Sequence, residues 1–339
     1  MCPEVLSARA LNRAVLGRQL LLERSSLAMP AALDQIAGIQ NQYAPNGYIG
    51  LWSRLADFKR ENLTAALESR EVVQGTTLRG TIHLVTPEFF QLSNDGVREE
   101  RAAWWFRASR RNDQETMRKV AQKIAGALSR GPRKRAQLVK ELGIDSVTWT
   151  GATAFLDLIR VPPSGTWENR RADLYELFSA PSIDPAAARR EMVDRYLRAF
   201  GPASAKDVAT FLGLHLNGIT PLLAEYRTFR TEDGIELFDV GDGLLPDPQT
   251  PAPPRFLPPW DANLLVHARR SRILPEEYRP LIFNTKLPQS VPTFLIDGKV
   301  AGTWRLDAVD LQISPYRKLD QRSAAALGEE AERLREFIS

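Results

Sequence analysis

The sequence predicts an α+β fold in which three helical modules, each closed by a pair of strands, precede a small β domain. The order helix, helix, helix, strand, strand recurs three times, and its helices stop at glycine or glycine–proline pairs. After Gly243 the composition changes to a proline-rich connector, Leu245 to Pro254, which cannot be helical. The recurring order is that of the winged helix-turn-helix, so we expect three tandem winged-helix modules and then a C-terminal β-barrel-like domain.

These boundaries divide the chain into four predicted domains. They are a first winged-helix module at residues 1–112, a second at 113–185, a third at 186–243, and a C-terminal β domain with a final helix at 244–339.

The second module has the clearest pattern. A basic helix is expected at Thr116–Leu128, where it ends at a Gly-Pro pair, and a shorter one at Lys134–Leu142. A third helix, Trp149–Leu158, precedes a strand, a turn rich in Pro and Gly, and a return strand.

The third and first modules repeat this order. In the third, Ser204 is the expected N-cap of helix Lys206–Leu212, helices Glu191–Phe200 and Ile219–Tyr226 flank it, and Asp233-Gly234 closes a hairpin. The segments expected in the first module are helices at Ser7–Leu22, Pro30–Tyr43, Gly47–Arg54 and Glu61–Ser69, and one extended stretch at Gly75–Val85.

The C-terminal domain is expected to be mostly strand. Phe256-Leu257, Asn263–Val266, Val291–Ile296 and Val300–Trp304 have strand composition, and Asp297-Gly298 is a hairpin turn signal between the last two. An amphipathic helix, residues 323–338, ends the chain.

Charge is unevenly distributed. The whole chain has a net charge of only +4, yet residues 101–140 hold twelve Lys or Arg against two acidic residues. Such a cluster is either a solvated helix face or a phosphate-binding surface, and charge alone does not separate the two readings.

Composition excludes several classes of protein. The apolar runs are too short for a membrane span, and the first residues lack the pattern of a signal peptide, so we expect a cytoplasmic, nucleoid-associated protein without membrane partners. A single cysteine (Cys2) and three scattered histidines cannot form a zinc or iron–sulfur site. We therefore expect no metal and no cofactor.

Four stretches resemble one family, the winged-helix DNA glycosylases of the AlkZ/YcaQ type. They are Ala37–Tyr43 continued by Gly47–Leu55, Leu78–Val85, Arg255–Asp261 continued by Arg272–Arg279, and Ile296–Arg305, in the order of the family. The resemblance implies tandem winged helices around duplex DNA, a C-terminal barrel, and excision of N7-alkylated purines, including purines in interstrand cross-links.

The resemblance also implies catalytic residues. The family motif is Gln, an apolar residue, then Gln or Asp, and Gln40 and Gln42 match its outer positions. Asn41 departs from the apolar middle position. The two-glutamine form resembles enzymes that give self-resistance to producers of alkylating natural products.

A glutamine pair suits a restricted chemistry. N7-alkylation makes the purine a cationic leaving group, so hydrolysis mainly requires a positioned water and a stabilised oxocarbenium-like transition state. Two neutral carboxamides can orient a water through their acceptor and donor groups, but they cannot act as a general base. No lysine is close to the pair in sequence, so we expect a monofunctional glycosylase without lyase activity.

Basic residues are the candidate DNA ligands. We expect Arg79 and His83 to share one face of the extended segment near the lesion, with His83 as a plain hydrogen-bonded core histidine being the alternative. Phosphate candidates are Arg107, Arg110, Arg111, Arg133, Lys134 and Arg135.

Two other functions fit the same sequence. A non-catalytic winged-helix DNA-binding protein, such as a transcription regulator, has the same fold, and so does a protein that binds alkylated DNA without cleaving it. Three modules in one chain favour a monomer that wraps duplex DNA over a regulator that dimerises on a palindrome.

Overall fold

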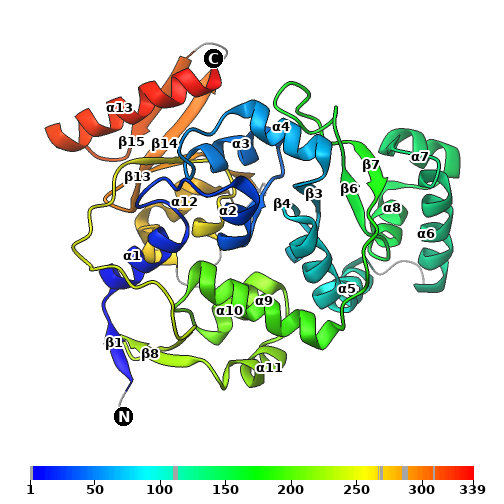
Figure 1. The fold of residues 1–339 in the computed structure, drawn as a ribbon, viewed down its shortest axis with the longest axis horizontal. Helices are drawn as coiled ribbons and strands as arrows, with labels where there is room; N and C mark the ends of the chain where they lie inside the picture. The colour runs from blue at the N-terminus through cyan, green and yellow to red at the C-terminus, as the bar shows by residue number, and fades with distance from the viewer. Residues whose placement is uncertain (1–2, 110–113, 266, 268–269, 285–288, 308–309) are drawn as a thin grey trace.

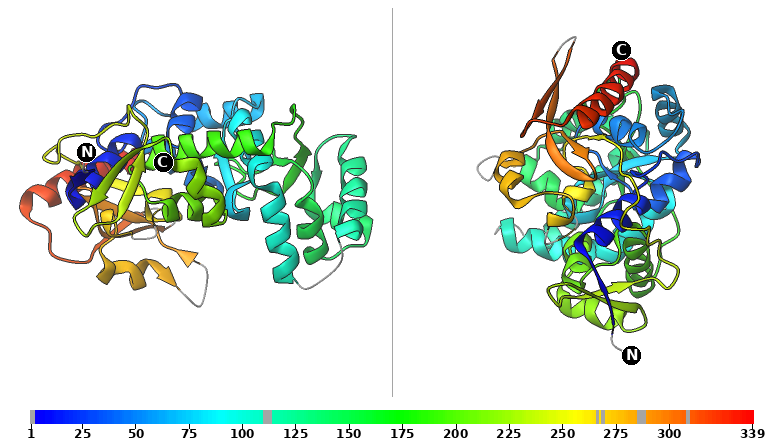
Figure 2. Two further views of the ribbon diagram at one scale, coloured as in Figure 1. Left: turned by 90° about the horizontal axis from the view of Figure 1, so that it is seen from below. Right: turned by 90° about the vertical axis from the view of Figure 1, so that its left-hand side faces the viewer.

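The computed structural model describes residues 3–109, 114–265, 267, 270–284, 289–307 and 310–339. The chain has a mixed α+β fold. In Figure 1, helices α6 to α8 form one end of the molecule, and the last strands with helix α13 form the other. Figure 2 shows that the helices of the second module and the segment formed by residues 276–284 project to the same side of the body.

The first module contributes three strands, β2, β3 and β4, to a six-stranded sheet. Its elements are β1 (Glu4–Leu6), α1 (Ala8–Arg18), α2 (Met29–Gln35), β2 (Ile39–Gln40), α3 (Ala44–Trp52), α4 (Arg60–Ser69), β3 (Val73–Thr76), a 3-10 turn η1 (Leu78–Gly80), β4 (Ile82–Val85) and α5 (Pro87–Ser109).

The second and third modules follow with the expected alternation of helices and paired strands. The second has α6 (Gln114–Leu128), β5 (Arg133–Lys134), α7 (Arg135–Leu142), α8 (Ser146–Thr153), β6 (Leu158–Arg160) and β7 (Leu174–Leu177). The third has α9 (Pro185–Phe200), α10 (Ala205–Leu212), α11 (Leu216–Ile219), η2 (Thr220–Leu223), β8 (Arg227–Thr231) and β9 (Glu236–Asp239).

The C-terminal region is mostly strand and turn. Its elements are β10 (Arg255–Leu257), η3 (Ala262–Leu264), η4 (Arg270–Arg272), η5 (Glu276–Tyr278), α12 (Arg279–Ile282), β11 (Phe283–Asn284), β12 (Gln289–Ser290), β13 (Thr293–Ile296), β14 (Lys299–Asp307), β15 (Asp310–Pro315) and α13 (Gln321–Ile338).

One six-stranded sheet joins the first two modules. Its order is β2-β4-β3-β6-β7-β5, and the junction is the antiparallel pairing of β3 with β6, where Gln74 lies opposite Arg160 and Gly75 opposite Ile159. Strand β1, from the start of the chain, pairs in parallel with β8 of the third module. Sheet pairing therefore connects segments that the sequence assigns to different modules.

The C-terminal sheet corrects one prediction. Strands β10, β13, β14 and β15 form an antiparallel sheet in that order, and no closed barrel is present among the described residues. Barrels that close are built from about five strands or more, and this sheet has too few. Helix α13 packs its apolar stripe of Leu327, Ala331 and Leu334 into the same core as Phe256 and Trp304 of the sheet.

Two local predictions in the first module are wrong. The helix expected at residues 30–43 ends at Gln35, because Ala37 and Gly38 turn the backbone left-handed with φ of 56° and 80°. The extended stretch expected at 75–85 is a hairpin: Thr77 N donates to Thr81 O, and Arg79 (φ 54°) lies in the turn. Periodicity does not report such turns, because one or two residues decide them.

Two predictions further along the chain are also wrong. The helix expected at residues 219–226 is the short α11 followed by the 3-10 turn η2, into which Pro221 falls. The strand expected at 263–266 begins as the 3-10 turn η3, whose N-cap Asp261 accepts a hydrogen bond from Asn263 N; residue 266 lies outside the described part. No helix in the described part of the chain is long and apolar enough to cross a membrane.

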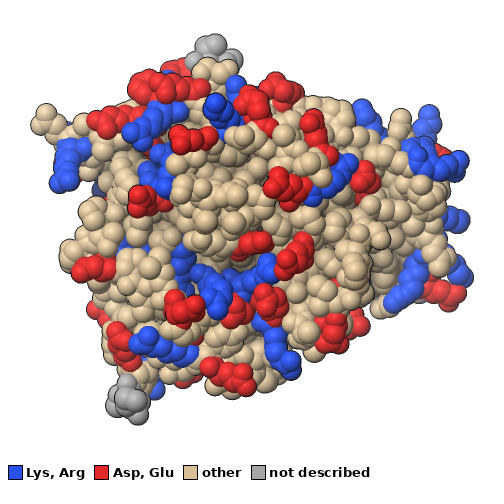
Figure 3. Space-filling view, in the orientation of Figure 1, with Lys and Arg blue, Asp and Glu red and all other residues tan. Residues whose placement is uncertain are grey.

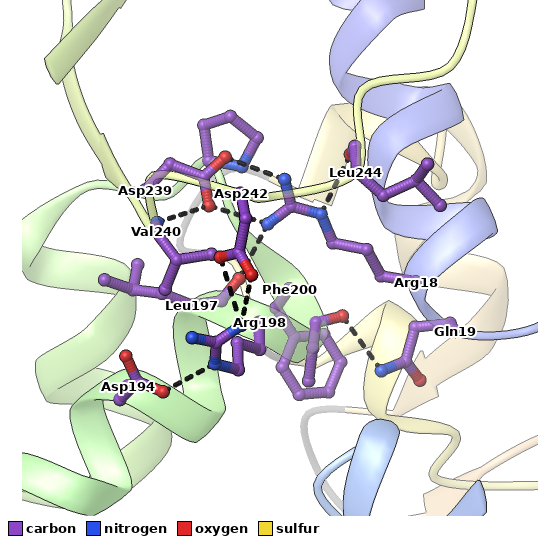
Figure 4. Close-up of polar contacts among 12 residues, drawn as sticks. Arg18, Gln19, Asp194, Leu197, Arg198, Phe200, Asp239, Val240, Asp242 and Leu244 are labelled. Carbon is purple, nitrogen blue, oxygen red and sulfur yellow. Dashed lines mark hydrogen bonds and ion pairs between the residues drawn. The ribbon is translucent and has the colours of Figure 1, made fainter. Parts of the chain in front are cut away.

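Buried ion pairs connect the modules. The Arg18 guanidinium of α1 donates to both carboxylate oxygens of Asp239 in β9 at 2.7 Å, and both side chains are almost fully buried. Arg18 also donates to the carbonyl oxygens of Leu197 and Leu244 (Figure 4). Arg54, in the turn after α3, donates through Nη2 to both carboxylate oxygens of Asp261 in the C-terminal region, with the shorter contact at 2.9 Å.

We predict that Asp239→Ala strongly destabilises the fold, because it leaves the Arg18 charge buried without its carboxylate. The expected loss in free energy of unfolding, measured by urea denaturation, is about 3 to 5 kcal/mol. The control is Lys119→Ala, which breaks the exposed Lys119–Glu115 pair and should cost less than about 0.5 kcal/mol. Equal losses in the two variants would contradict the prediction.

Candidate active site

Gln40 is buried on an edge strand of the six-stranded sheet. It occupies the two-residue strand β2, faces His83 of β4 across an antiparallel pair, and is 5% exposed. The turn at Gly38 delivers the chain to this strand; any side chain at Gly38 would collide with Val85. The next strand over, β3, places Gly75 opposite the same histidine. Gln40 therefore lies at one edge of the shared sheet.

Gln42 lies two residues beyond, in the bend between β2 and α3, and is exposed. Neighbouring Tyr43 is 47% exposed, and its hydroxyl accepts a hydrogen bond from Arg170 Nη1 at 3.0 Å. The glutamine pair thus consists of one buried amide fixed in a sheet and one amide open to a partner.

Arg79 contacts Gln40, but it does not share a strand face with His83 as predicted. It lies in the η1 turn, not on a continuous strand with His83, and its Nη2 donates to Gln40 Oε1 at 3.3 Å. Its Nη1 donates to Phe211 O of α10 at 2.7 Å, and its guanidinium carbon lies 4.9 Å from the centroid of the Phe211 ring. Burial lowers the pKa of Arg79 to about 10, so it remains a cation at neutral pH.

His83 is fully buried and neutral. Burial, reinforced by the nearby charge of Arg79, lowers the pKa of His83 to about 3. Its Nδ1 lies 3.1 Å from Thr81 O, and a carbonyl can only accept, so Nδ1 carries the proton. The structure brings Gln40, Arg79 and His83 together.

The basic phosphate candidates lie elsewhere. Lys134 is exposed at the start of α7, Arg133 pairs with Glu141, and Arg135 packs 5.7 Å from the Trp149 ring centroid. Arg107 is exposed near the end of α5, and Arg110 and Arg111 lie outside the described residues. Lys and Arg side chains gather at the end of the molecule that α6 to α8 occupy (Figure 3).

The six-stranded sheet fixes the distance between Gln40 and the phosphate candidates Arg133 and Lys134. Strand β2 with Gln40 and strand β5 with Arg133 and Lys134 are its opposite edges. Five steps between neighbouring strands amount to roughly 24 Å, which corresponds to about seven base pairs of a duplex.

Sequence reasoning missed two residues of this region, Gln74 and Arg170. Gln74 is 0% exposed and hydrogen-bonds Asn41, and Arg170 bonds Tyr43. Neither is near the motif in the chain, so no local pattern marks them. Three surface cavities of about 450, 590 and 680 Å³ lie elsewhere, and neither Gln40 nor Gln42 lines any of them. The described residues contain no group of three His, Cys, Asp or Glu side chains arranged to hold a metal.

Comparisons with known proteins place the chain in a class. A family model described as DNA glycosylase AlkZ-like matches residues 33–337, so the chain belongs to the AlkZ-like DNA glycosylase family, as the sequence resemblance indicated. The comparison with curated proteins found no match. Among solved structures, the chain is similar to the DNA glycosylase AlkZ of Streptomyces sahachiroi, with 18% identity, a TM-score of 0.81, and coverage of 98% of this chain and 97% of that one.

We predict that His83 makes stability depend on pH. Its folded pKa of about 3 lies below the ordinary 6.5, so between those values the unfolded state binds more protons, and stability falls as pH falls below about 6.5. Between pH 7 and pH 5 this group should cost about 2 kcal/mol of unfolding free energy.

Urea denaturation at the two pH values tests this. His83→Gln should have a smaller loss between pH 7 and pH 5 than the wild type, with the remainder carried by groups such as buried His267, whose pKa is also lowered to about 3. Exposed His215 provides the control, because His215→Gln should keep the wild-type dependence. An unchanged dependence in His83→Gln would refute the assignment.

Proposed function

We propose that this protein hydrolyses the N-glycosidic bond of N7-alkylated purines in duplex DNA, with Gln40 and Gln42 positioning the attacking water. The main support is that the Gln40 amide is buried and hydrogen-bonded while the Gln42 amide, two residues on, is exposed. The chain also belongs to the AlkZ-like DNA glycosylase family. Water held between them would attack C1′ as the charged base leaves.

The electrostatics of the site favour this chemistry. The bond from Arg79 fixes the oxygen end of the Gln40 carboxamide, which leaves its second lone pair and its NH₂ group to orient a water. Because His83 is neutral, it adds no positive charge beside an oxocarbenium-like transition state. Neither glutamine can supply acid or base catalysis, so neutral lesions should react poorly.

DNA binding is proposed through the three modules as winged helices. Support comes from the helix and hairpin order of each module and from the basic side chains around α7, at the opposite sheet edge from Gln40. A duplex that follows the sheet would contact Lys134 about seven base pairs from the lesion.

Cross-linked purines are included in the proposed substrates. Gln42 lies on an exposed bend and lines none of the three cavities above, so a bulky adduct or a second strand would not have to enter them. Self-resistance to a genotoxic natural product is the corresponding biological role. Arg79 and His83 surround Gln40, and no lysine is among these contacts, which supports a monofunctional reaction that leaves an intact abasic site.

We predict that Gln40→Ala and Gln42→Ala each suppress base release from duplex containing N7-methylguanine or a nitrogen-mustard cross-link. The expected drop in single-turnover rate is at least about 100-fold, because the water loses its orientation in the transition state. Released base and alkali-labile abasic sites are the readouts.

The control for this prediction is Gln321→Ala, an exposed glutamine on α13, which should keep the wild-type rate. DNA affinity should change less than about twofold in the two site variants, since they act on the transition state. If the wild-type protein releases no base from either substrate, the result would instead favour the non-catalytic DNA-binding function.

We predict that Lys134→Ala combined with Arg135→Ala weakens DNA binding whatever the sequence and flattens its salt dependence. Each phosphate interaction that the double variant loses should reduce the slope of log K against log salt by about 0.9. The matched control is Lys318→Ala with Arg322→Ala, an exposed Lys and Arg beside α13 at the other end of the molecule. Equal slopes in both double variants would show that α7 does not contact phosphates.

A further inference from the structure

Asn41 is buried between the two proposed catalytic glutamines and makes three hydrogen bonds. It is 3% exposed, and its backbone N donates to Ile82 O at 2.7 Å. Its side-chain Oδ1 accepts from Gly47 N at 2.9 Å, in the first turn of α3. Its Nδ2 donates to Gln74 Oε1 at 3.2 Å. The side chain therefore fixes both ends of the bend that carries Gln42.

Gln74 extends this contact into the second module. It is 0% exposed on β3, and its Nε2 donates to Gly165 O at 2.9 Å. Gly165 belongs to the β6–β7 loop, residues 161–173, and has φ of +75°. Any side chain at Gly165 would collide with the Gln74 amide, so the loop backbone can reach Gln74 only with glycine there. We name the chain of contacts Asn41–Gln74–Gly165 the amide relay.

Two further contacts hold the same loop against the same segment. Arg170 donates to the hydroxyl of Tyr43, the residue after Gln42. Trp167 packs edge to face on Tyr48 of α3, with ring centroids 5.6 Å apart. The β6–β7 loop of the second module therefore contacts the segment that follows Asn41 at two points, Tyr43 and Tyr48.

We propose that Asn41 is a positioning residue of the glycosylase site, which acts with Gln74 to hold the Gln42 bend against the β6–β7 loop of the second module. This inference rests on the proposed function. An apolar residue at position 41 would leave the Gly47 N–H and the Gln74 amide oxygen buried without these partners, which is unfavourable. An amide at 41 satisfies both and makes the placement of Gln42 depend on a loop of the second module.

Gln74→Glu provides a test in which the expected loss of rate depends on pH. A protonated glutamic acid can accept from Asn41 and donate its O–H to Gly165 O, as the amide does, whereas the carboxylate would repel that carbonyl. Burial raises the pKa of a carboxyl at this position, so the protonated form persists at mildly acidic pH and gives way to the carboxylate as pH rises.

The measured quantity is the single-turnover rate of N7-methylguanine release by Gln74→Glu divided by the wild-type rate at the same pH, after subtraction of spontaneous loss. The ratio should be near one at about pH 5 and fall by about tenfold at pH 8 as the relay bond breaks. A ratio that does not change with pH overturns the proposal.

A double-mutant cycle keeps the proposal testable if Gln74→Glu does not fold. Asn41→Ala and Gln74→Ala should each reduce the single-turnover rate by about tenfold, and the double variant should be no slower than the slower single one, because both break one relay. DNA affinity should stay within about twofold of wild type. If the rate reduction in the double variant equals the product of the two single reductions, the residues act independently and the amide relay is overturned.

Gln19→Ala is the matched control. Gln19 is an equally buried amide that donates to Ile36 O and Ala199 O, at 3.2 and 3.1 Å. Its loss should reduce stability but not the rate. Wild-type rates in Asn41→Ala and Gln74→Ala would overturn the positioning role alone, whereas wild-type protein that releases no base would overturn the proposed function and this inference with it.

Discussion

The pairing of β3 with β6 is the contact on which the proposed site depends. It merges strands of the first and second modules into one sheet, with Gln40 near one edge and the basic β5 at the other. Gly75 makes this possible, because any larger side chain there would collide with the Phe90 ring of α5, which covers the sheet. The sheet thus fixes both the distance from Gln40 to the candidate phosphate ligands on β5 and the contact between Gly165 of the β6–β7 loop and Gln74.

Buried arginine–carboxylate pairs fix the remaining parts of the chain around this sheet. Arg18 connects α1 to the third module through Asp239, and Arg54 connects the turn after α3 to the C-terminal region through Asp261 (Figure 4 for the first pair). Such pairs contribute little net stability, since desolvation offsets their attraction, but loss of one partner is costly. We therefore expect their main effect to be the selection of one arrangement of the modules. Arg54 and Asp261 also lie in two of the stretches that carry the family resemblance, which gives those residues a structural role.

The proposed site combines two neutral groups, the Gln40 amide and the His83 imidazole, with one cation, Arg79. Gln40 is an uncharged amide, and His83 is kept uncharged by burial, while Arg79 supplies a cation that contacts Gln40. In the proposed reaction this arrangement suits a base that is already cationic when it leaves, because the two amides supply no acid or base catalysis. A lesion with a neutral leaving group would need chemistry that these side chains do not provide.

Sequence reasoning was most successful where a signal is local. Ser204 with Asp207 forms the expected capping box, and Asp297-Gly298 forms the expected hairpin turn between β13 and β14. It failed where one residue changes direction: the helix over residues 30–43 stops at Gln35, and Arg79 turns a supposed strand into a hairpin.

The sequence by itself determined the α+β class, the alternation of helices and hairpins, the family, and the candidate pair Gln40 and Gln42, because capping residues, turn dipeptides and motif spacing are properties of neighbouring residues. Only the tertiary structure decided that Gln40 is buried and Gln42 exposed, that Arg79 reaches Gln40 from a turn, and that Gln74 connects Asn41 to Gly165. These contacts join residues up to 91 positions apart. They depend on which strands pair, and strand pairing between modules leaves no periodic trace in the chain.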